Sequence, residues 1–101
     1  MRDTELYGGL VRLHILYHAS KEPVFGLGIM EELRRHGYNL SAGTLYPMLH
    51  SMEEKGFLRS KPRIVDGKTR RNYLITANGR AALSAAMVKV RELFGELFEE
   101  D

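Results

Sequence analysis

The chain has 101 residues, of which 44% are hydrophobic and 28% charged, a composition typical of one small globular domain. It contains no cysteine, which excludes disulfides, thiolate metal sites and cysteine nucleophiles. No apolar run approaches the roughly 20 residues of a membrane-spanning helix, and the polar start "MRDTELYGG" is unlike a secretory signal. We therefore expect a cytoplasmic protein.

The formal net charge is only +2, but the charges are unevenly distributed along the chain. Residues 57–73 hold six basic side chains and one acidic side chain, Asp66. Residues 92–101 hold five acidic side chains and no basic one. This segregation predicts a positive region, suited to an anionic partner, and a negative end.

Helical periodicity predicts a first helix over about residues 4–19. An apolar stripe recurs there at steps of three and four, formed by Leu6, Leu10, Leu13 and Tyr17. The segment "SKEPVFG" that follows contains Pro23 and is interpreted as a connection.

A second helix is predicted over about residues 26–36, with Ile29, Met30 and Leu33 facing inward. Gly37 is a suitable residue to end it, because glycine adopts the left-handed conformation that often follows a helix. The link to the next helix, "GYNL", is short.

A third helix is predicted to begin after Ser41 as its N-cap and to end at Gly56. Its apolar stripe contains Leu45, Leu49 and Met52. Pro47 lies inside this helix, where proline costs about 3 kcal/mol and removes one hydrogen bond. The carbonyl left without that bond belongs to Gly43, whose backbone can bend or approach a phosphate closely.

Two extended segments follow, "FLRSKPRIV" and "TRRNYLIT", separated by a turn that contains Asp66 and Gly67. Asp-Gly between such segments is a strong hairpin signal, because both turn positions tolerate positive φ. Pro62 suits an edge strand. The last helix is predicted from about Thr76 to Phe98, with an apolar seam like that of a coiled coil.

This order predicts a mainly α fold with a small β-hairpin, a winged helix-turn-helix followed by a C-terminal dimerisation helix. In that arrangement the second helix of the pair, which begins at Ser41, enters the major groove of DNA. The basic hairpin, or wing, would neutralise phosphates and so supply affinity that is independent of sequence.

The chain resembles the PadR-like family of transcriptional regulators along nearly its whole length. The resemblance rests on "LYGGLVRLHILYHASKEPVFGLGI", on "SAGTLYPMLHSMEEKGFL" with its Gly-Thr-Leu-Tyr-Pro motif, and on "DGKTRRNYLITANGRAAL". It implies a DNA-binding domain over residues 1–76 and a helix over residues 77–101 that pairs two subunits, as in the short subfamily with one C-terminal helix. Leu27 departs from the family pattern, which often has an aromatic residue there.

The residues that we expect to contact DNA are the polar face of the third helix and the cations of the wing. They are Ser41, Gly43, Thr44, Tyr46, Pro47, His50, Lys61, Arg63, Lys68, Arg70 and Arg71. Each group also has a simpler interpretation, because a helix face can merely be solvated and charges on an edge strand can merely prevent aggregation. The clustering of the cations around one turn, next to a compact polar helix face, favours DNA.

The expected dimer contact combines the first and last helices. Its residues are Leu6, Leu10, Leu83, Met87, Val90, Phe94 and Leu97. Tyr7, Tyr17, Phe94 and Phe98 could line a cavity for a small-molecule effector at this interface, although aromatic residues more often serve simple interface packing.

No catalytic constellation is present, so we do not expect an enzyme. His14 and His18 have the i, i+4 spacing that can chelate a metal, but a structural or surface role is favoured, with His36 and His50 elsewhere in the sequence. We expect no metal and no cofactor.

These observations predict a dimeric transcriptional repressor that binds double-stranded DNA at a pseudo-palindromic operator. A small-molecule effector at the dimer interface is the less favoured addition, and it would act by changing the spacing of the two recognition helices. The alternative is a winged-helix module that binds proteins and not DNA. The two differ in whether the protein binds duplex DNA with an affinity that falls steeply as salt rises.

Overall fold

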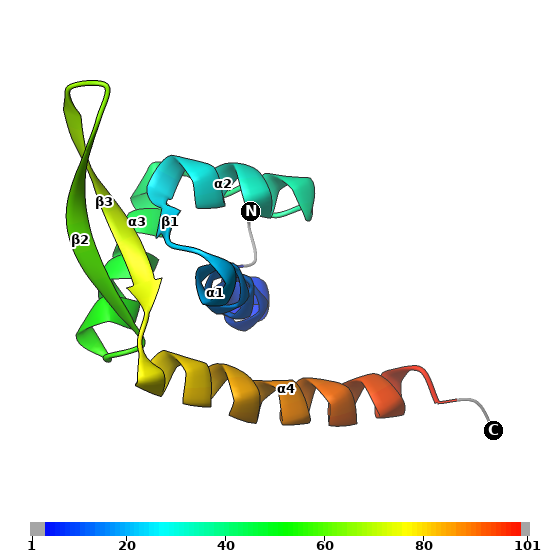
Figure 1. The fold of residues 1–101 in the computed structure, drawn as a ribbon. Coiled ribbons are helices and arrows are strands. Elements are labelled where there is room, and N and C mark those ends of the chain that lie inside the picture. The colour runs from blue at the N-terminus through cyan, green and yellow to red at the C-terminus, as the bar shows by residue number, and fades with distance from the viewer. Residues whose placement is uncertain (1–3, 100–101) are drawn as a thin grey trace.

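A computed structural model describes residues 4–99. The described elements, in chain order, are α1 (Thr4–Lys21), β1 (Val24–Phe25), α2 (Gly26–Arg35), α3 (Ala42–Glu54), β2 (Leu58–Val65), β3 (Lys68–Ile75) and α4 (Ala77–Leu97), as Figure 1 shows. The four predicted helices and the predicted hairpin are confirmed, with bounds that differ by one or two residues. The described residues contain no helix that is both long and apolar enough to cross a bilayer.

The core is formed where α1, α2 and α3 meet the inner end of the sheet. Its fully buried side chains are Val11, Ile15, Leu33, Leu45, Leu49 and Leu58. The predicted stripes of α2 and α3 are confirmed, since Ile29 and Leu33 are buried, and so are Leu45, Met48, Leu49 and Met52.

Helix α1 is apolar on two sides, and the predicted stripe is the outer one. Leu6, Leu10 and Tyr17 are exposed, whereas Val11 and Ile15 face the core. Spacing alone identified an apolar face but could not show that a second one lies beside it.

The sheet has three antiparallel strands in the order β1-β3-β2, so the small hairpin carries an additional strand. The segment interpreted as a connection contains β1, in which Val24 pairs with Tyr73 and Phe25 with Asn72. Two residues are too few to show a strand period, so this strand was not predictable from alternation. It holds the start of α2 against the wing.

The turns and helix ends adopt the backbone conformations that the sequence predicts. Asp66 and Gly67 have φ values of 51° and 75°, which confirms the hairpin turn. Gly37 and Gly56 have positive φ at the ends of α2 and α3. Thr76 caps α4, because its side-chain oxygen accepts a hydrogen bond from the Gly79 amide at 2.9 Å.

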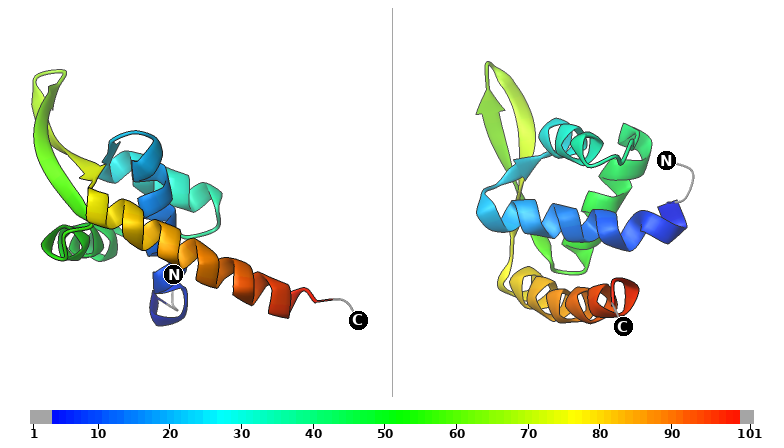
Figure 2. Two further views of the ribbon diagram at one scale, coloured as in Figure 1. Left: turned by 60° about the horizontal axis from the view of Figure 1, so that its bottom comes forward. Right: turned by 90° about the vertical axis from the view of Figure 1, so that its right-hand side faces the viewer.

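Helix α4 leaves the sheet, passes α1 and extends beyond the rest of the molecule (Figures 1 and 2). Its apolar side chains from Met87 onward are more than 40% exposed, including Val90 and Phe94. An apolar face of this length, uncovered within one chain, is typical of a surface that packs against a partner.

Candidate nucleic-acid interface

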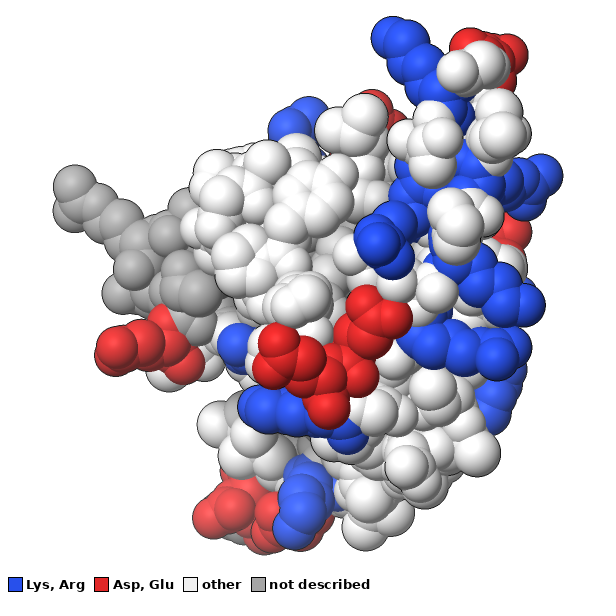
Figure 3. Space-filling model, turned by 90° about the vertical axis from the view of Figure 1, so that its left-hand side faces the viewer, with Lys and Arg blue, Asp and Glu red and all other residues white. Residues whose placement is uncertain are grey.

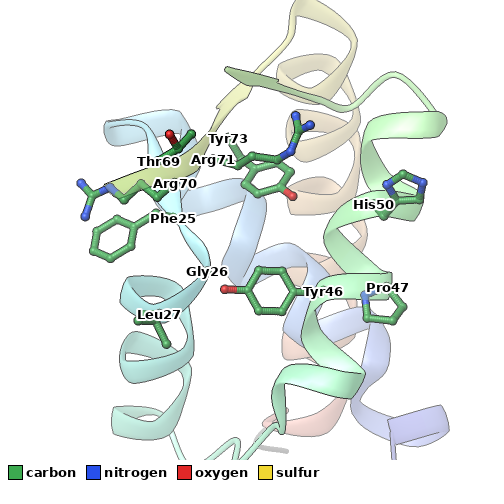
Figure 4. Close-up of a pocket in the computed structure, with 10 residues that line it drawn as sticks. All are labelled: Phe25, Gly26, Leu27, Tyr46, Pro47, His50, Thr69, Arg70, Arg71 and Tyr73. Atoms are coloured by element: carbon green, nitrogen blue, oxygen red, sulfur yellow. The ribbon is translucent and has the colours of Figure 1, made fainter. Parts of the chain in front are cut away.

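A groove of about 770 Å³ lies between α3 and the wing, with β1 and the start of α2 at its inner side (Figure 4). It is lined by Phe25, Gly26, Leu27, Tyr46, Pro47, His50, Thr69, Arg70, Arg71 and Tyr73. Five residues expected to contact DNA therefore meet in one place, although α3 and β3 are separated by a whole strand in the sequence. These five are Tyr46, Pro47, His50, Arg70 and Arg71.

Tyr46 leans from α3 toward the first residue of α2 (Figure 4). Its phenol lies so close to Gly26 that a β-carbon at position 26 would overlap the hydroxyl and the ring. The ring is nevertheless 42% exposed, so one side of it remains open to the groove. Gly26 thus sets the position of a large side chain on the exposed face of α3.

Pro47 lies inside α3 and is exposed, with Gly43 also exposed one turn earlier. A β-carbon at Gly43 would meet only the Ser41 hydroxyl oxygen, at 3.8 Å, so the backbone there is open. The carbonyl of Gly43 cannot receive a helical hydrogen bond from Pro47, and its position on the surface leaves it accessible to water or a ligand.

The N-terminus of α3 holds Ser41, Gly43 and Thr44, which lie outside the groove lining. Ser41 is the N-cap residue as predicted, but its hydroxyl bonds the Thr44 hydroxyl at 3.3 Å and makes no cap to the backbone. The expected side-chain cap is therefore wrong. The Thr44 amide donates to the Ser41 carbonyl at 3.1 Å, so the amides suited to an anion are those of Ala42 and Gly43, to which the helix supplies no acceptor.

His50 projects from α3 and is exposed. Its Nε2 lies 3.1 Å from Oε1 of Glu54 one turn later. This partner holds the imidazole over the outer face of α3, at the end of the groove nearest to the start of β2 (Figure 4).

A hydrogen-bonded chain joins α3 to both strands of the wing. The Ser60 amide and hydroxyl donate to Oε2 of Glu53 at 2.7 and 2.8 Å, and Nη1 of Arg71 donates to the Ser60 hydroxyl at 2.8 Å. The side-chain bond from Ser60 lowers the pKa of Glu53, with smaller contributions from the Ser60 amide and the Arg71 charge. The wing is therefore fixed to α3, and Arg71 is oriented before any ligand arrives.

Arg70 points to the other side of β3, where its guanidinium lies 3.6 Å from the centre of the Phe25 ring (Figure 4). Such stacking holds the planar group while leaving its charge in place. Tyr73 of β3 is buried in the core, and this burial raises the pKa of its phenol.

The remaining predicted cations, Lys61, Arg63 and Lys68, are exposed along the outer wing and do not line the groove. Arg63 is paired with Arg70 across the strands, so their side chains share one face. Blue side chains gather along the right-hand side of Figure 3. Among residues 4–99 no lysine or arginine of the wing forms a salt bridge, so these charges are available to an anion.

Sequence reasoning missed the residues that orient the others, namely Phe25, Gly26, Glu53 and Ser60. Glu53 had the appearance of a solvated helix residue, and Ser60 that of an ordinary strand position. Their contact depends on how β2 crosses α3, and no local pattern reports it.

A second groove, of about 670 Å³, lies between α1 and α4. It brings together five of the residues expected at a dimer contact, Leu10, Leu83, Met87, Val90 and Phe94. Leu6 and Leu97 lie outside its lining, exposed on the same two helices. Of the aromatic residues considered for an effector, Tyr17 and Phe94 line it, and Tyr7 and Phe98 do not.

The model of the transcriptional regulator PadR-like family matches residues 15–85, which is most of the chain. The protein belongs to the PadR-like family. Transcriptional regulator Rv3488 of Mycobacterium tuberculosis is 48% identical over 93 residues, covering 92% of this chain and 87% of that relative. This PadR-like protein is accordingly a transcriptional regulator and not an enzyme.

Solved structures show the same fold. A PadR family regulator from Eggerthella lenta superposes on this PadR-like chain with a TM-score of 0.80 at 29% identity, over 96% of this chain and 88% of that one. A Streptococcus transcriptional regulator reaches a TM-score of 0.84 at 23% identity, over 94% and 95% of the two chains. The predicted winged-helix fold is confirmed.

Proposed function

We propose that this regulator binds a pseudo-palindromic operator in double-stranded DNA as a homodimer, with α3 of each subunit in the major groove. The observation that carries the proposal is the groove between α3 and β3, which exposed Tyr46, Pro47 and His50 line together with Arg70 and Arg71. A recognition helix beside fixed cations is the arrangement that reads base edges while holding the phosphate backbone.

The side chains divide into two roles in this proposal. Thr44, Tyr46 and His50 contact base edges, because Tyr46 and His50 are exposed on α3 and Thr44 is half-buried in its first turn. Ser41 and Gly43 bring the first turn of α3 to a phosphate, which its free amides and positive dipole end stabilise. The wing cations, which form no salt bridge within residues 4–99, neutralise neighbouring phosphates and release their counterions.

The dimer in this proposal forms where α4 and α1 leave apolar side chains exposed. Burial of these side chains is favourable by about 25 cal/mol for each Å² of apolar area removed from water. Residues 1–76 then serve as the DNA-binding unit and 77–101 as the pairing helix. A C2 dimer places its recognition helices about 34–36 Å apart, one turn of DNA.

We also propose that operator binding in the cytoplasm represses transcription by excluding the polymerase, and that a small-molecule effector relieves it. The groove between α1 and α4 supports the effector, because it is mostly apolar and lies beside the proposed dimer contact. A ligand there would favour dimers whose recognition helices have the wrong spacing.

Selection of bound duplexes from a random pool tests the proposal. Enrichment of a motif with two half-sites about one helical turn apart is expected, with affinity that falls steeply as salt rises. Absence of duplex binding at low salt would overturn it and favour a module that binds proteins only. Enrichment of a single half-site would contradict the dimer and leave DNA binding intact.

A further inference from the structure

Three of the four histidines meet at one point in the fold. His14 and His18 lie one turn apart on α1, and His36 follows the last residue of α2. One ring nitrogen from each lies within 4.8 Å of the others. The His14 and His36 rings are stacked, with centroids 4.6 Å apart. The sequence interpretation set His36 apart from the pair, and the packing of α2 against α1 corrects this.

A carboxylate completes the group. Oε1 of Glu32 lies 3.5 Å from Nε2 of His36 and 3.8 Å from Nε2 of His18. Its other oxygen, Oε2, accepts a hydrogen bond from Arg35 at 2.8 Å, which holds the carboxylate in place. Oε1 therefore faces the imidazoles while Arg35 orients the side chain from behind.

The cluster contains a polar atom that packing alone does not explain. Nε2 of His18 is buried, and within residues 4–99 it has no hydrogen-bond partner. A ring nitrogen without a hydrogen-bond partner is the kind of atom that can bind a metal ion.

We propose that His14, His18 and His36, together with Oε1 of Glu32, bind one divalent transition-metal ion of the Zn²⁺ class. Three imidazole nitrogens and one carboxylate oxygen are a ligand set that Zn²⁺ and Co²⁺ accept in tetrahedral geometry. With bonds of about 2.0–2.1 Å, such an ion separates its ligand atoms by about 3.4 Å. The imidazole ligand atoms lie within 4.8 Å of one another, and Oε1 of Glu32 lies 3.5 and 3.8 Å from two of them. All four side chains are exposed or half-buried, so they can rotate toward a shared ion.

The ion would connect the two functional parts of the molecule. His14 and His18 belong to α1, which lies beside α4, whereas Glu32 belongs to α2 and His36 directly follows it, before α3. The cluster also lines the groove between α1 and α4. Resting on the proposed function, we infer that the metal sets the angle between the pairing helices and the recognition helix, and so changes operator affinity.

The test is a titration of tag-free, metal-depleted protein with Co²⁺, monitored by visible absorption, followed by competition with Zn²⁺. We expect one Co²⁺ for each chain, with the intense absorption of tetrahedral coordination, and its loss on addition of Zn²⁺. No cysteine can contribute thiolate ligands to this spectrum. A spectrum equal to that of aqueous Co²⁺ throughout the titration would overturn the proposal.

Variants assign the ligands. His36→Ala changes an exposed residue after the end of α2, so the fold should persist, and Glu32→Gln replaces the carboxylate by a neutral amide of nearly the same shape. Each should weaken Co²⁺ binding at least about tenfold. His50→Ala is the matched control, because it removes another imidazole that faces a glutamate, outside the cluster. Equal loss in the control, or full binding in both ligand variants, would contradict the assignment.

DNA binding is measured independently of metal binding. Operator affinity of the wild type and of His36→Ala is measured with and without Zn²⁺, and only the wild type should respond. A protein that binds Co²⁺ but no DNA supports the metal site and overturns the proposed function. A protein that binds DNA with equal affinity in both conditions overturns the regulatory coupling.

Discussion

The phenol of Tyr46 on α3 lies directly against Gly26, the residue at which α2 begins, with no room for a β-carbon between them. This contact lets the two helices of the helix-turn-helix share one surface, with the tyrosine held partly over the groove. The absence of a side chain at position 26 therefore determines where a candidate base-contacting residue lies.

Gly26→Ala should displace Tyr46 without changing a charge or unfolding the chain, since the overlapping atoms are the far end of a side chain. If Tyr46 contacts a base, operator affinity should fall by about 1–3 kcal/mol, or roughly 5- to 150-fold. Fluorescence anisotropy with the selected duplex measures the effect. Gly95→Ala is the control, because a β-carbon there meets nothing within 4 Å. If Gly26→Ala bound the operator with wild-type affinity, Tyr46 would not be a DNA contact.

Replacement of Arg70 and Arg71 by alanine should reduce the salt dependence of DNA binding. Each phosphate contact contributes about −0.9 to the slope of log K against log salt concentration, so the slope should become shallower by about 1.8 if both contact phosphates. Anisotropy at a series of salt concentrations gives the slope. Arg80→Ala with Lys89→Ala removes the same charge from exposed positions on α4 and should leave the slope nearly unchanged. Equal slopes in the two double variants would show that the DNA phosphates do not contact Arg70 and Arg71.

If the protein forms the proposed dimer, Val90→Asp should convert it to a monomer, because it places a charge in the apolar seam of α4. Light scattering coupled to size exclusion measures the mass. Val88→Asp is the matched control, since it makes the same change on the same helix at a position that is 71% exposed and outside the seam. An unchanged dimer in Val90→Asp would refute this pairing surface.

The Glu53 carboxylate should make the free energy of unfolding fall more steeply at acid pH. Its pKa is lowered in the folded state, mainly by the hydrogen bond from Ser60, so the unfolded state binds more protons as pH falls below about 4.5. The stabilisation is thus present above this pH and is lost as pH falls through the lowered pKa. Urea unfolding at a series of pH values from about 6 to about 3 should show a shallower loss of unfolding free energy in Glu53→Gln than in the wild type.

The control for this measurement is Glu54→Gln, which removes a carboxylate from the adjacent position of α3 without touching Ser60. If the unfolding free energies of Glu53→Gln and Glu54→Gln had the same pH dependence, the hydrogen bonds between Glu53 and Ser60 would make no specific contribution to stability. Glu53→Gln should also lower operator affinity, because Arg71 is oriented through Ser60.

Much of the fold was predictable because its signals are local. Leu45, Leu49 and Met52 recur at the helical period and are buried as that period requires. Asp66 and Gly67 adopt the positive φ values that their side chains permit. The strand β1 was not predictable, since two residues carry no period and its partner, β3, lies more than 40 residues later.

The sequence by itself determined the helices, the hairpin, the charge of the wing and the family, because period, turn chemistry and motif are properties of neighbouring residues. Only the tertiary structure decided that Arg70 stacks on Phe25, that Ser60 joins Glu53 to Arg71, and that His36 meets His14 and His18. These contacts join residues on different elements. Their formation depends on the angles at which helices and strands pack around a shared core, and those angles are set by many side chains together.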